Sequence, residues 1–207
     1  MFDPPPTIDP AIEVQLASRG YSKGLAQTEG GQLLIRGELA SGPFLAQAYW
    51  KNVDSAQASG ESGILIGARA TAGGVALRVT AGYKHLTGVN GATDQDAFEF
   101  TGEASRRFGR LTPRLSLAWS PDDLGGTRHS LYAEAGASYR MVGHTSLFAS
   151  VGRRERSGGD DYTAFSAGLS QQVGDHVTAE LRWNDSARSA RGDAYEGRAV
   201  AMLRIRF

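Results

Sequence analysis

We expect this chain to form an all-β protein, an up-and-down antiparallel transmembrane β-barrel of twelve strands, and three observations predict it. Apolar and polar residues alternate with a period of two in twelve segments. Tight and longer connections alternate between these segments, as they do between periplasmic turns and extracellular loops. Three tryptophans, Trp50, Trp119 and Trp183, end strands that would run in the same direction.

Length and composition are compatible with one large domain. The 207 residues contain no linker-like stretch, and the absence of cysteine excludes disulfide bonds and thiolate metal ligands. No run approaches the roughly 18 apolar residues of a spanning helix, whereas a barrel strand needs an apolar residue only at every second position. A net charge of zero gives no indication of a nucleic-acid partner.

The first ten residues, MFDPPPTIDP, differ from the rest of the chain. They lack the basic and apolar regions of a signal peptide, so we interpret them as a mature N-terminus behind an added methionine. Their prolines favour an extended conformation. We therefore expect a Pro-rich periplasmic segment over 1–10 and a single transmembrane β-barrel domain over 11–207.

The twelve expected strands are bounded by Gly, Asp, Asn and Pro residues. Amphipathic helices would need apolar residues at three- and four-residue spacing, which stretches such as 177–183 do not provide. In chain order, the strands are expected near 11–21, 31–40, 43–52, 62–72, 75–86, 96–108, 111–120, 129–141, 144–154, 162–173, 176–185 and 194–207.

The connections indicate which ends of the strands lie together. Longer loops would face the outside, tight turns would face the periplasm, and an even strand number would leave both termini on the periplasmic side. Paired glycines, such as Gly73 and Gly74, are turn residues here, since no helix follows them. Tight turns are expected near 41–43, 72–74, 109–110, 142–143 and 174–175, and longer loops near 22–30, 53–61, 87–95, 121–128, 155–161 and 186–193.

Aromatic residues would flank the lipid-facing band at both ends of the barrel. Trp50, Trp119 and Trp183 would lie at the outer membrane interface. Amphipathic rings prefer this depth, and cross-strand packing in a soluble sandwich would not place all three at one end. The opposite ends of the strands carry Phe44, Phe108, Tyr139 and Phe207.

The last strand shows the expected division between lipid and lumen. Its odd-numbered residues from Ala199 to Phe207 are apolar, whereas the other face carries three arginines, Arg198, Arg204 and Arg206. A terminal aromatic on such a strand also resembles the signal that barrel-assembly machinery recognises. We therefore expect that machinery to be a partner during biogenesis.

The less apolar face of the strands carries fourteen basic and seven acidic residues, which predicts a basic lumen. Twelve strands are compatible both with an open pore and with a lumen filled by paired Arg and Glu side chains. In an open pore, excess arginine would favour anions. The residues expected to line the pore are Arg36, Arg69, Arg78, Arg114, Glu134, Glu180, Arg182, Arg198 and Arg204.

Acidic residues gather in the expected loops. Carboxylate pairs could bind calcium or bridge to lipopolysaccharide phosphates, but no loop has full calcium-ligand spacing, and solvation of the loop is the commoner role. We therefore expect no metal site. The carboxylate pairs are Asp94 with Asp96, Asp122 with Asp123 and Asp160 with Asp161, and the other acids placed in loops are Asp185 and Asp193.

Three segments of the chain have motif-like sequences. They are Ser18–Ser22 followed by Gln27–Gly30, Trp119–Asp122 with Leu131–Ala135, and Asp160–Tyr162 with Gly168–Ser170. These segments resemble the TorF family of Gram-negative outer-membrane porins, although the aromatic pair that usually precedes the first motif is missing. The resemblance spans most of 11–207. It implies a barrel and a porin, and it implies no catalytic residues.

The four histidines do not predict catalysis. A Ser/His pair on the outer wall would need two side chains on one face within hydrogen-bond reach. His129 and Ser130 are adjacent and therefore point apart. We expect no enzymatic activity, no catalytic residue and no cofactor.

The leading hypothesis is a monomeric Gram-negative outer-membrane porin that transports small solutes by passive diffusion, with an anion bias. Its expected partners are membrane lipid and lipopolysaccharide, with no nucleic acid. An alternative is a closed structural barrel whose loops contact lipopolysaccharide or protein. More remote alternatives are an outer-membrane hydrolase and a soluble ligand-binding barrel, which would bury the three tryptophans.

Overall fold

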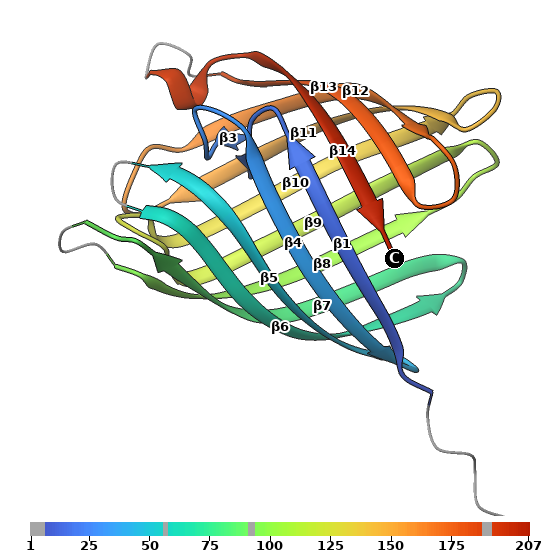
Figure 1. Cartoon of the computed structure of the whole chain (residues 1–207), viewed down its shortest axis with the longest axis horizontal. Coiled ribbons are helices and arrows are strands. Elements are labelled where there is room, and N and C mark those ends of the chain that lie inside the picture. The colour runs from blue at the N-terminus through green and yellow to red at the C-terminus, as the bar shows by residue number, and fades with distance from the viewer. Residues whose placement is uncertain (1–6, 56–57, 91–93, 188–191) are drawn as a thin grey trace, which may run out of the picture.

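The computed structural model describes residues 7–55, 58–90, 94–187 and 192–207, and these form a closed antiparallel β-barrel (Figure 1). No helix within these ranges is both long and apolar enough to cross a membrane. The twelve barrel strands are β1 (Asp9–Ala17), β4 (Gln32–Ser41), β5 (Phe44–Ser55), β6 (Ala58–Ala72), β7 (Val75–Thr87), β8 (Asp96–Arg106), β9 (Leu111–Asp123), β10 (Arg128–Arg140), β11 (Thr145–Arg156), β12 (Tyr162–Gln172), β13 (Val177–Ser186) and β14 (Arg198–Arg206).

The barrel confirms the predicted fold class. Each strand pairs antiparallel with its neighbours in the sequence, and the ring closes between β1 and β14, where Glu13 faces Arg206 and Ala17 faces Met202. Such closure leaves no unpaired sheet edge. The start of β1 and the C-terminus lie at the end of the barrel that carries the tight turns, as an even strand number requires (Figure 1).

Strand boundaries differ from the prediction mainly at the loop end. β5 and β6 continue their pairing to Ser55 and Ala58, so only residues 56–57 separate them and the expected long loop over 53–61 is wrong. β9 and β10 likewise extend into 121–128. The last strand begins at Arg198 rather than 194, because a short 3-10 helix, η2 (Asp193–Tyr195), precedes it.

The expected Pro-rich segment over 1–10 falls largely outside the described residues. Its last two residues, Asp9 and Pro10, belong to β1 and pair with Ala40 and Leu39 of β4. The barrel therefore begins two residues earlier than predicted. Pro10 is compatible with this position because it lies next to the start of the strand.

The outer wall of the barrel is apolar. Side chains such as Ile64, Ile66 and Leu115 are exposed on it, whereas the residues between them point inward. A surface of this size and composition is expected where lipid, rather than water, is the solvent. The period-two alternation thus divides each strand between an apolar outside and a polar inside.

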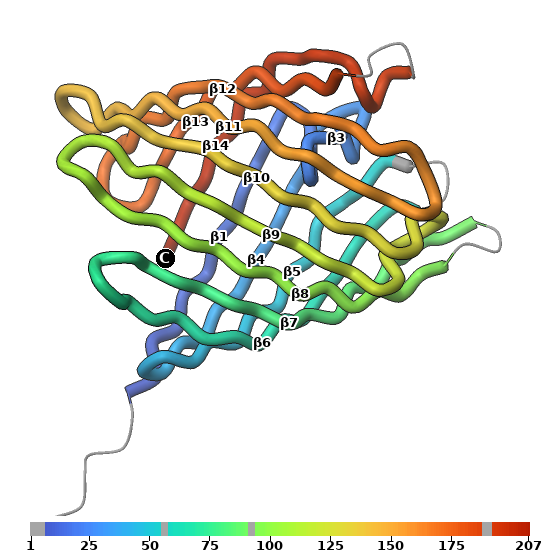
Figure 2. The backbone as a smooth tube through the Cα atoms, turned by 180° about the vertical axis from the view of Figure 1, so that it is seen from behind, coloured from blue at the N-terminus to red at the C-terminus, as the bar shows by residue number. Residues whose placement is uncertain are grey.

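A second, smaller sheet lies inside the ring of strands. β2 (Tyr21–Ser22) and β3 (Leu25–Ala26) pair as a hairpin, where the sequence predicted the end of the first strand and a loop. Lys23 and Gly24 form its tip, with φ angles of 50° and 80°, and positive φ at both central residues is typical of a tight hairpin turn. Figures 1 and 2 both place β3 within the outline of the barrel, at the loop end.

Candidate functional site: the lumen and the hairpin that crosses it

The hairpin, defined here as residues 20–27, crosses the lumen. It leaves the wall between β1 and β4, which are neighbours in the ring. Its tip contacts β8 and β9, which lie on the opposite side of the same ring. The loop end of the lumen is therefore spanned by the chain itself.

Charged groups fasten the tip to the far wall. The ammonium of Lys23 donates to Glu99 and lies 3.1 Å from the carboxylate of Asp123. Lys84 lies 2.6 Å from Glu99, and Arg154 lies 2.7 Å from Asp123. All five side chains are largely buried, and buried charges are tolerated only when they are paired and hydrogen-bonded in this way.

Uncharged contacts hold the same tip from the side of β12. The Tyr162 side chain is completely buried, and its hydroxyl donates to the carbonyl of Lys23 at 2.7 Å. Gly24 has no space for a side chain, because a Cβ there would lie 2.1 Å from the Cβ of Ala164. The hairpin is therefore packed against the wall, not suspended in solvent.

The base of the hairpin is tied to the loop that follows β13. Arg19 is buried, donates to the Thr28 carbonyl at 2.7 Å and donates to the Asp193 carboxylate at 2.7 Å. The hydrogen bond from Arg19 is the largest cause that lowers the pKa of Asp193 below its usual value. Burial raises the pKa of the nearby Tyr21 hydroxyl.

A second buried polar group supports the hairpin on the β5–β6 side. Lys51 donates to the side chain of Gln27 at 2.6 Å and lies 3.1 Å from Glu61. Glu61 also accepts a hydrogen bond of 2.7 Å from the hydroxyl of Tyr49. Charge-assisted hydrogen bonds of this kind are roughly twice as strong as neutral ones.

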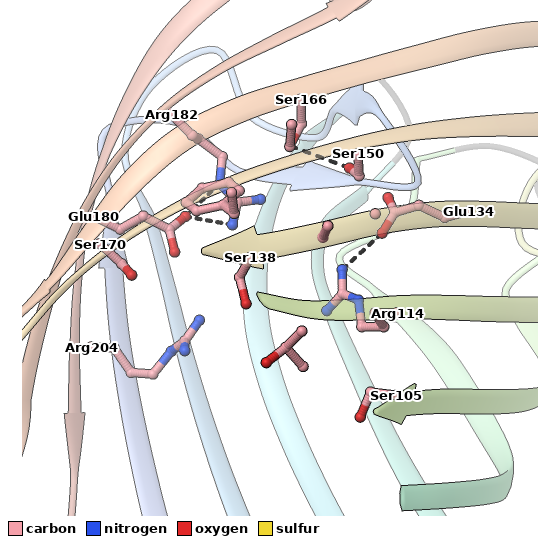
Figure 3. Close-up of a pocket in the computed structure, with 15 residues that line it drawn as sticks. Ser105, Arg114, Glu134, Ser138, Ser150, Ser166, Ser170, Glu180, Arg182 and Arg204 are labelled. Atoms are coloured by element: carbon pink, nitrogen blue, oxygen red, sulfur yellow. Dashed lines mark hydrogen bonds and ion pairs between the residues drawn. The ribbon is translucent and has the colours of Figure 1, made fainter. Parts of the chain in front are cut away.

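The hairpin lies between two hollow regions. Toward the turns, a cavity of about 450 Å³ is lined by Arg114, Arg182 and Arg204, and we call it the inner cavity (Figure 3). Toward the loops, a basin of about 420 Å³ is lined by Lys84, Arg154 and residues of the hairpin. A smaller hollow of about 110 Å³ shares Arg182 with the inner cavity and Lys23 with the basin.

Five of the nine predicted pore-lining residues meet in the inner cavity. Arg114 donates to Glu134 at 2.8 Å, and Arg182 pairs with Glu180. Arg204 has only a distant carboxylate, that of Glu13, 3.8 Å from its Nε atom. Figure 3 shows these side chains converging from β9, β10, β13 and β14.

The other four predicted residues lie elsewhere in the lumen. Arg36 lies 3.5 Å from Glu13, and Arg78 lies 3.4 Å from Glu38. Arg69 is the register partner of Arg78, and no ion pair engages it within the described part of the chain. Arg198 lies at the loop end, where it pairs with Asp193 and Glu196.

Some charged residues were assigned to the wrong environment. Asp123 was expected in a solvated loop, but it ends β9 and is 4% exposed, because Lys23, Arg154 and Ser130 all bond its carboxylate. Asp122 likewise belongs to β9, and Asp96 and Asp185 belong to β8 and β13. Arg19, Arg107 and Glu196 were expected on strands, but they lie in connections.

The tryptophans and other predicted interface aromatics are on the outer wall. Trp50, Trp119 and Trp183 are 41%, 40% and 52% exposed and lie near the loop end of β5, β9 and β13. Phe44, Phe108, Tyr139 and Phe207 are also exposed, at or next to the turn ends of their strands. A soluble ligand-binding barrel would have buried the tryptophans.

One histidine has a neighbouring serine and carboxylate. His85 faces Ser62 on β6 in register, and its Nδ1 atom lies 2.7 Å from Asp96. Ser62 makes no side-chain hydrogen bond among the described residues, so its hydroxyl lacks the contact with a base that nucleophilic catalysis requires. No group of three His, Asp or Glu residues in the described ranges is placed to hold a metal ion.

Comparison with other proteins gives one family match. The family model described as "Bacterial protein of unknown function (Gcw_chp)" matches residues 40–203. Among curated protein sequences, none matches the chain.

Solved structures with the same fold include three channels of the outer-membrane type. The KdgM porin in complex with disordered oligogalacturonate is 10% identical over 95% of this chain and 99% of its own, with a TM-score of 0.68. The NanC porin is 8% identical over 95% and 98%, with a TM-score of 0.62. An outer membrane channel from Pseudomonas putida F1 is 12% identical over 98% and 95%, with a TM-score of 0.55.

Proposed function

The chain belongs to the Gcw_chp family of bacterial proteins of unknown function, and we propose that it is a Gram-negative outer-membrane channel for passive diffusion of small solutes, with a preference for anions. The apolar outer wall supports the membrane location, since only a closed barrel satisfies the backbone of strands placed in lipid. The similarity in fold to the KdgM and NanC porins is consistent with this location. The finer assignment to the TorF porin family is part of the same proposal.

The observation that carries the proposal is the inner cavity with its arginines. Arg114, Arg182 and Arg204 line a hollow of about 450 Å³ in the turn half of the lumen. Arg69 and Arg140, also on strands, have no carboxylate partner among the described residues. Unpaired positive charge beside a low-dielectric wall raises the local concentration of anions.

The hairpin is the expected constriction of this channel. Lys23 lines both the basin and the smaller hollow, so a solute that passes from one to the other passes its ammonium. A lysine at this expected constriction, together with Lys84 and Arg154 against the two carboxylates of Glu99 and Asp123, would add to the anion preference, as rings of Arg or Lys do in anion-selective pores.

Conductance in planar bilayers tests the proposal. We expect the folded wild-type protein to conduct, with a reversal potential in a KCl gradient that reports anion selectivity. A matched variant replaces residues 21–26 by two glycines, a link that the 2.8 Å hydrogen bond between Gln27 N–H and the Gly20 carbonyl permits. Cation selectivity of the wild-type protein, or no conductance from either folded protein, would overturn the proposal.

A closed structural barrel is the second candidate, and the buried network at Lys23 favours it. If that network never opens, the loop end is sealed and the exposed loops carry the function. The wild-type protein would then show no conductance in planar bilayers, whereas the variant without residues 21–26 would conduct. On this reading, lipopolysaccharide or another protein would be the partner of the loops.

A further inference from the structure

We infer that the inner cavity is a binding site for hydroxylated monocarboxylates, small solutes that carry one carboxylate and several hydroxyl groups. The inference deepens the proposed channel function and rests on it only for the route by which the solute enters. The cavity has hydrogen-bonding groups without protein partners among the described residues, and its lining carries one more arginine than glutamate.

Arg204 supplies the anion-binding group. Its guanidinium points into the cavity (Figure 3), and its Nε atom is buried with no hydrogen-bond partner. The nearest carboxylate is that of Glu13, whose Oε2 atom lies 3.8 Å from Nε, beyond hydrogen-bond reach, and whose other oxygen lies 3.5 Å from Arg36. The Met202 sulfur, 3.9 Å from Nη2, is a weak acceptor. A carboxylate is the group that matches the fork of an arginine and satisfies two of its donors at once.

The two other arginines of the cavity are already engaged. Arg114 donates to Glu134, whose second oxygen accepts from the hydroxyl of Tyr132 at 2.9 Å. Both Nε and Nη2 of Arg182 contact the same Oε1 atom of Glu180, and Oε2 accepts no hydrogen bond from the described residues. Three arginines and two glutamates give the cavity a formal charge of plus one. One negative charge on the solute therefore balances the cavity, whereas a second would meet two carboxylates.

Hydroxyl groups also line the cavity. Ser105, Ser138 and Ser170 line the cavity, and their side chains make no hydrogen bonds among the described residues. Each hydroxyl is both a donor and an acceptor, so these serines can donate hydrogen bonds to solute hydroxyls or accept hydrogen bonds from them. A solute that cannot hydrogen-bond to these hydroxyls should bind weakly, because the hydroxyls would lose their water and gain no new hydrogen-bond partner.

The size and the remaining lining are compatible with such a solute. A volume of about 450 Å³ lies in the range of roughly 300 to 1,000 Å³ typical of small-molecule sites. The aromatic ring in the lining, Phe148, is covered on one side by the Arg182 guanidinium at 5.2 Å. The cavity lining is thus more polar than apolar, although Ala137 and Ala149 also belong to it.

Binding of four probes to the folded full-length protein in detergent, measured by calorimetry, tests the inference. Gluconate has one charge and five hydroxyls, hexanoate has the charge without the hydroxyls, glucose has hydroxyls without charge, and glucarate has a second carboxylate. We expect gluconate to bind about tenfold more tightly than each of the others, as one charge-assisted hydrogen bond allows. Equal binding of hexanoate, glucose or glucarate would overturn the inference.

Variants locate the site. Arg204→Gln should weaken gluconate binding about tenfold, and Ser138→Ala about threefold, as one charged and one neutral hydrogen bond predict. Arg153→Gln is the matched control, because Arg153 lies outside the cavity and pairs with Asp161 on the loop side. If Arg204→Gln does not fold, Ser138→Ala decides alone, and unchanged binding contradicts the site.

The binding site and the channel function can each be overturned without the other. A protein that conducts anions but does not distinguish gluconate from hexanoate would overturn this inference and leave the channel function intact. A protein that binds gluconate through Arg204 in detergent but never conducts would support the binding site and overturn the channel function.

Discussion

The ammonium of Lys23 lies 3.1 Å from the carboxylate of Asp123, although a hundred residues of chain separate them. The contact joins a hairpin that starts between β1 and β4 to the strand on the opposite side of the barrel. It therefore ties the hairpin across the loop end of the lumen.

Replacing Lys23 by methionine should enlarge the pore without unfolding the barrel. Asp123 keeps Arg154 and Ser130 as partners, and Glu99 keeps Lys84, so no buried charge is left alone. We expect a higher single-channel conductance and weaker anion selectivity in planar bilayers. Lys23→Arg is the control, because it retains the charge. Conductance of Lys23→Met equal to that of the wild-type protein would show that the tip does not limit flow.

Replacing Tyr162 by phenylalanine should loosen the hairpin while keeping the ring that packs beside it. The change removes the 2.7 Å hydrogen bond to the Lys23 carbonyl, a loss of about 1 kcal/mol in the stability of the docked hairpin. Lys23 is a trypsin site, so cleavage after it should become several-fold faster in the folded protein at a protease concentration that leaves the wild-type protein intact. Cleavage at the wild-type rate would mean that the hydrogen bond does not hold the tip.

Replacing Gly24 by alanine should displace the tip of the hairpin from the wall of the barrel more than Tyr162→Phe does. The residue has a φ angle of 80°, and its new Cβ would lie 2.1 Å from that of Ala164. The left-handed conformation alone costs about 1 to 2 kcal/mol for a residue with a side chain. Ala164→Gly in the same chain should restore part of the protection against trypsin, because it removes the clash but not the strain. Gly30→Ala is the control, since nothing lies within 4 Å of a Cβ there.

The Arg19–Asp193 contact should persist through mildly acidic pH. The hydrogen bond from Arg19 lowers the pKa of Asp193, so the contact contributes stability above the ordinary aspartate value of about 3.9 and loses it only as pH falls through the lower, folded-state value. Carboxyl NMR of the folded protein should give a titration midpoint for Asp193 below that ordinary value. In the Arg19→Gln variant, the titration midpoint of Asp193 should rise. A midpoint that does not respond to this change would assign the shift to another cause.

The strands could be predicted because the alternation that identifies them lies within each short segment of the sequence. In β14, the direction of each side chain follows from its position in the chain, so alternation between Leu203 and Arg204 identifies the strand and its two faces at once. The same reasoning placed Arg114, Glu134, Glu180, Arg182 and Arg204 in the lumen. Which carboxylate each arginine would meet could not be predicted, because pairing depends on the register of separate strands.

The hairpin could not be predicted in the same way. Its strands have two residues each, too few for a periodic pattern, although the Lys23-Gly24 pair between them is compatible with a two-residue turn. Its position depends on Glu99, Asp123 and Tyr162, three residues that become its neighbours only when the barrel closes. Asp123 was misplaced for the same reason, since only the folded barrel brings Lys23 to it.

Deleting Phe207 should impair assembly before it alters transport. Its N–H donates to the Ile12 carbonyl at 2.9 Å, and the Ile12 N–H donates to its carbonyl at 3.2 Å, so the residue extends the seam between β1 and β14. Its exposed ring stacks beside His176, with the two centroids 6.5 Å apart. We expect a lower fraction of heat-modifiable, folded protein in the outer membrane, with the few inserted molecules conducting like the wild-type protein. Phe207→Tyr keeps an aromatic ring and should assemble normally. Normal insertion of the truncated chain would show that the terminal residue is dispensable for closing the barrel.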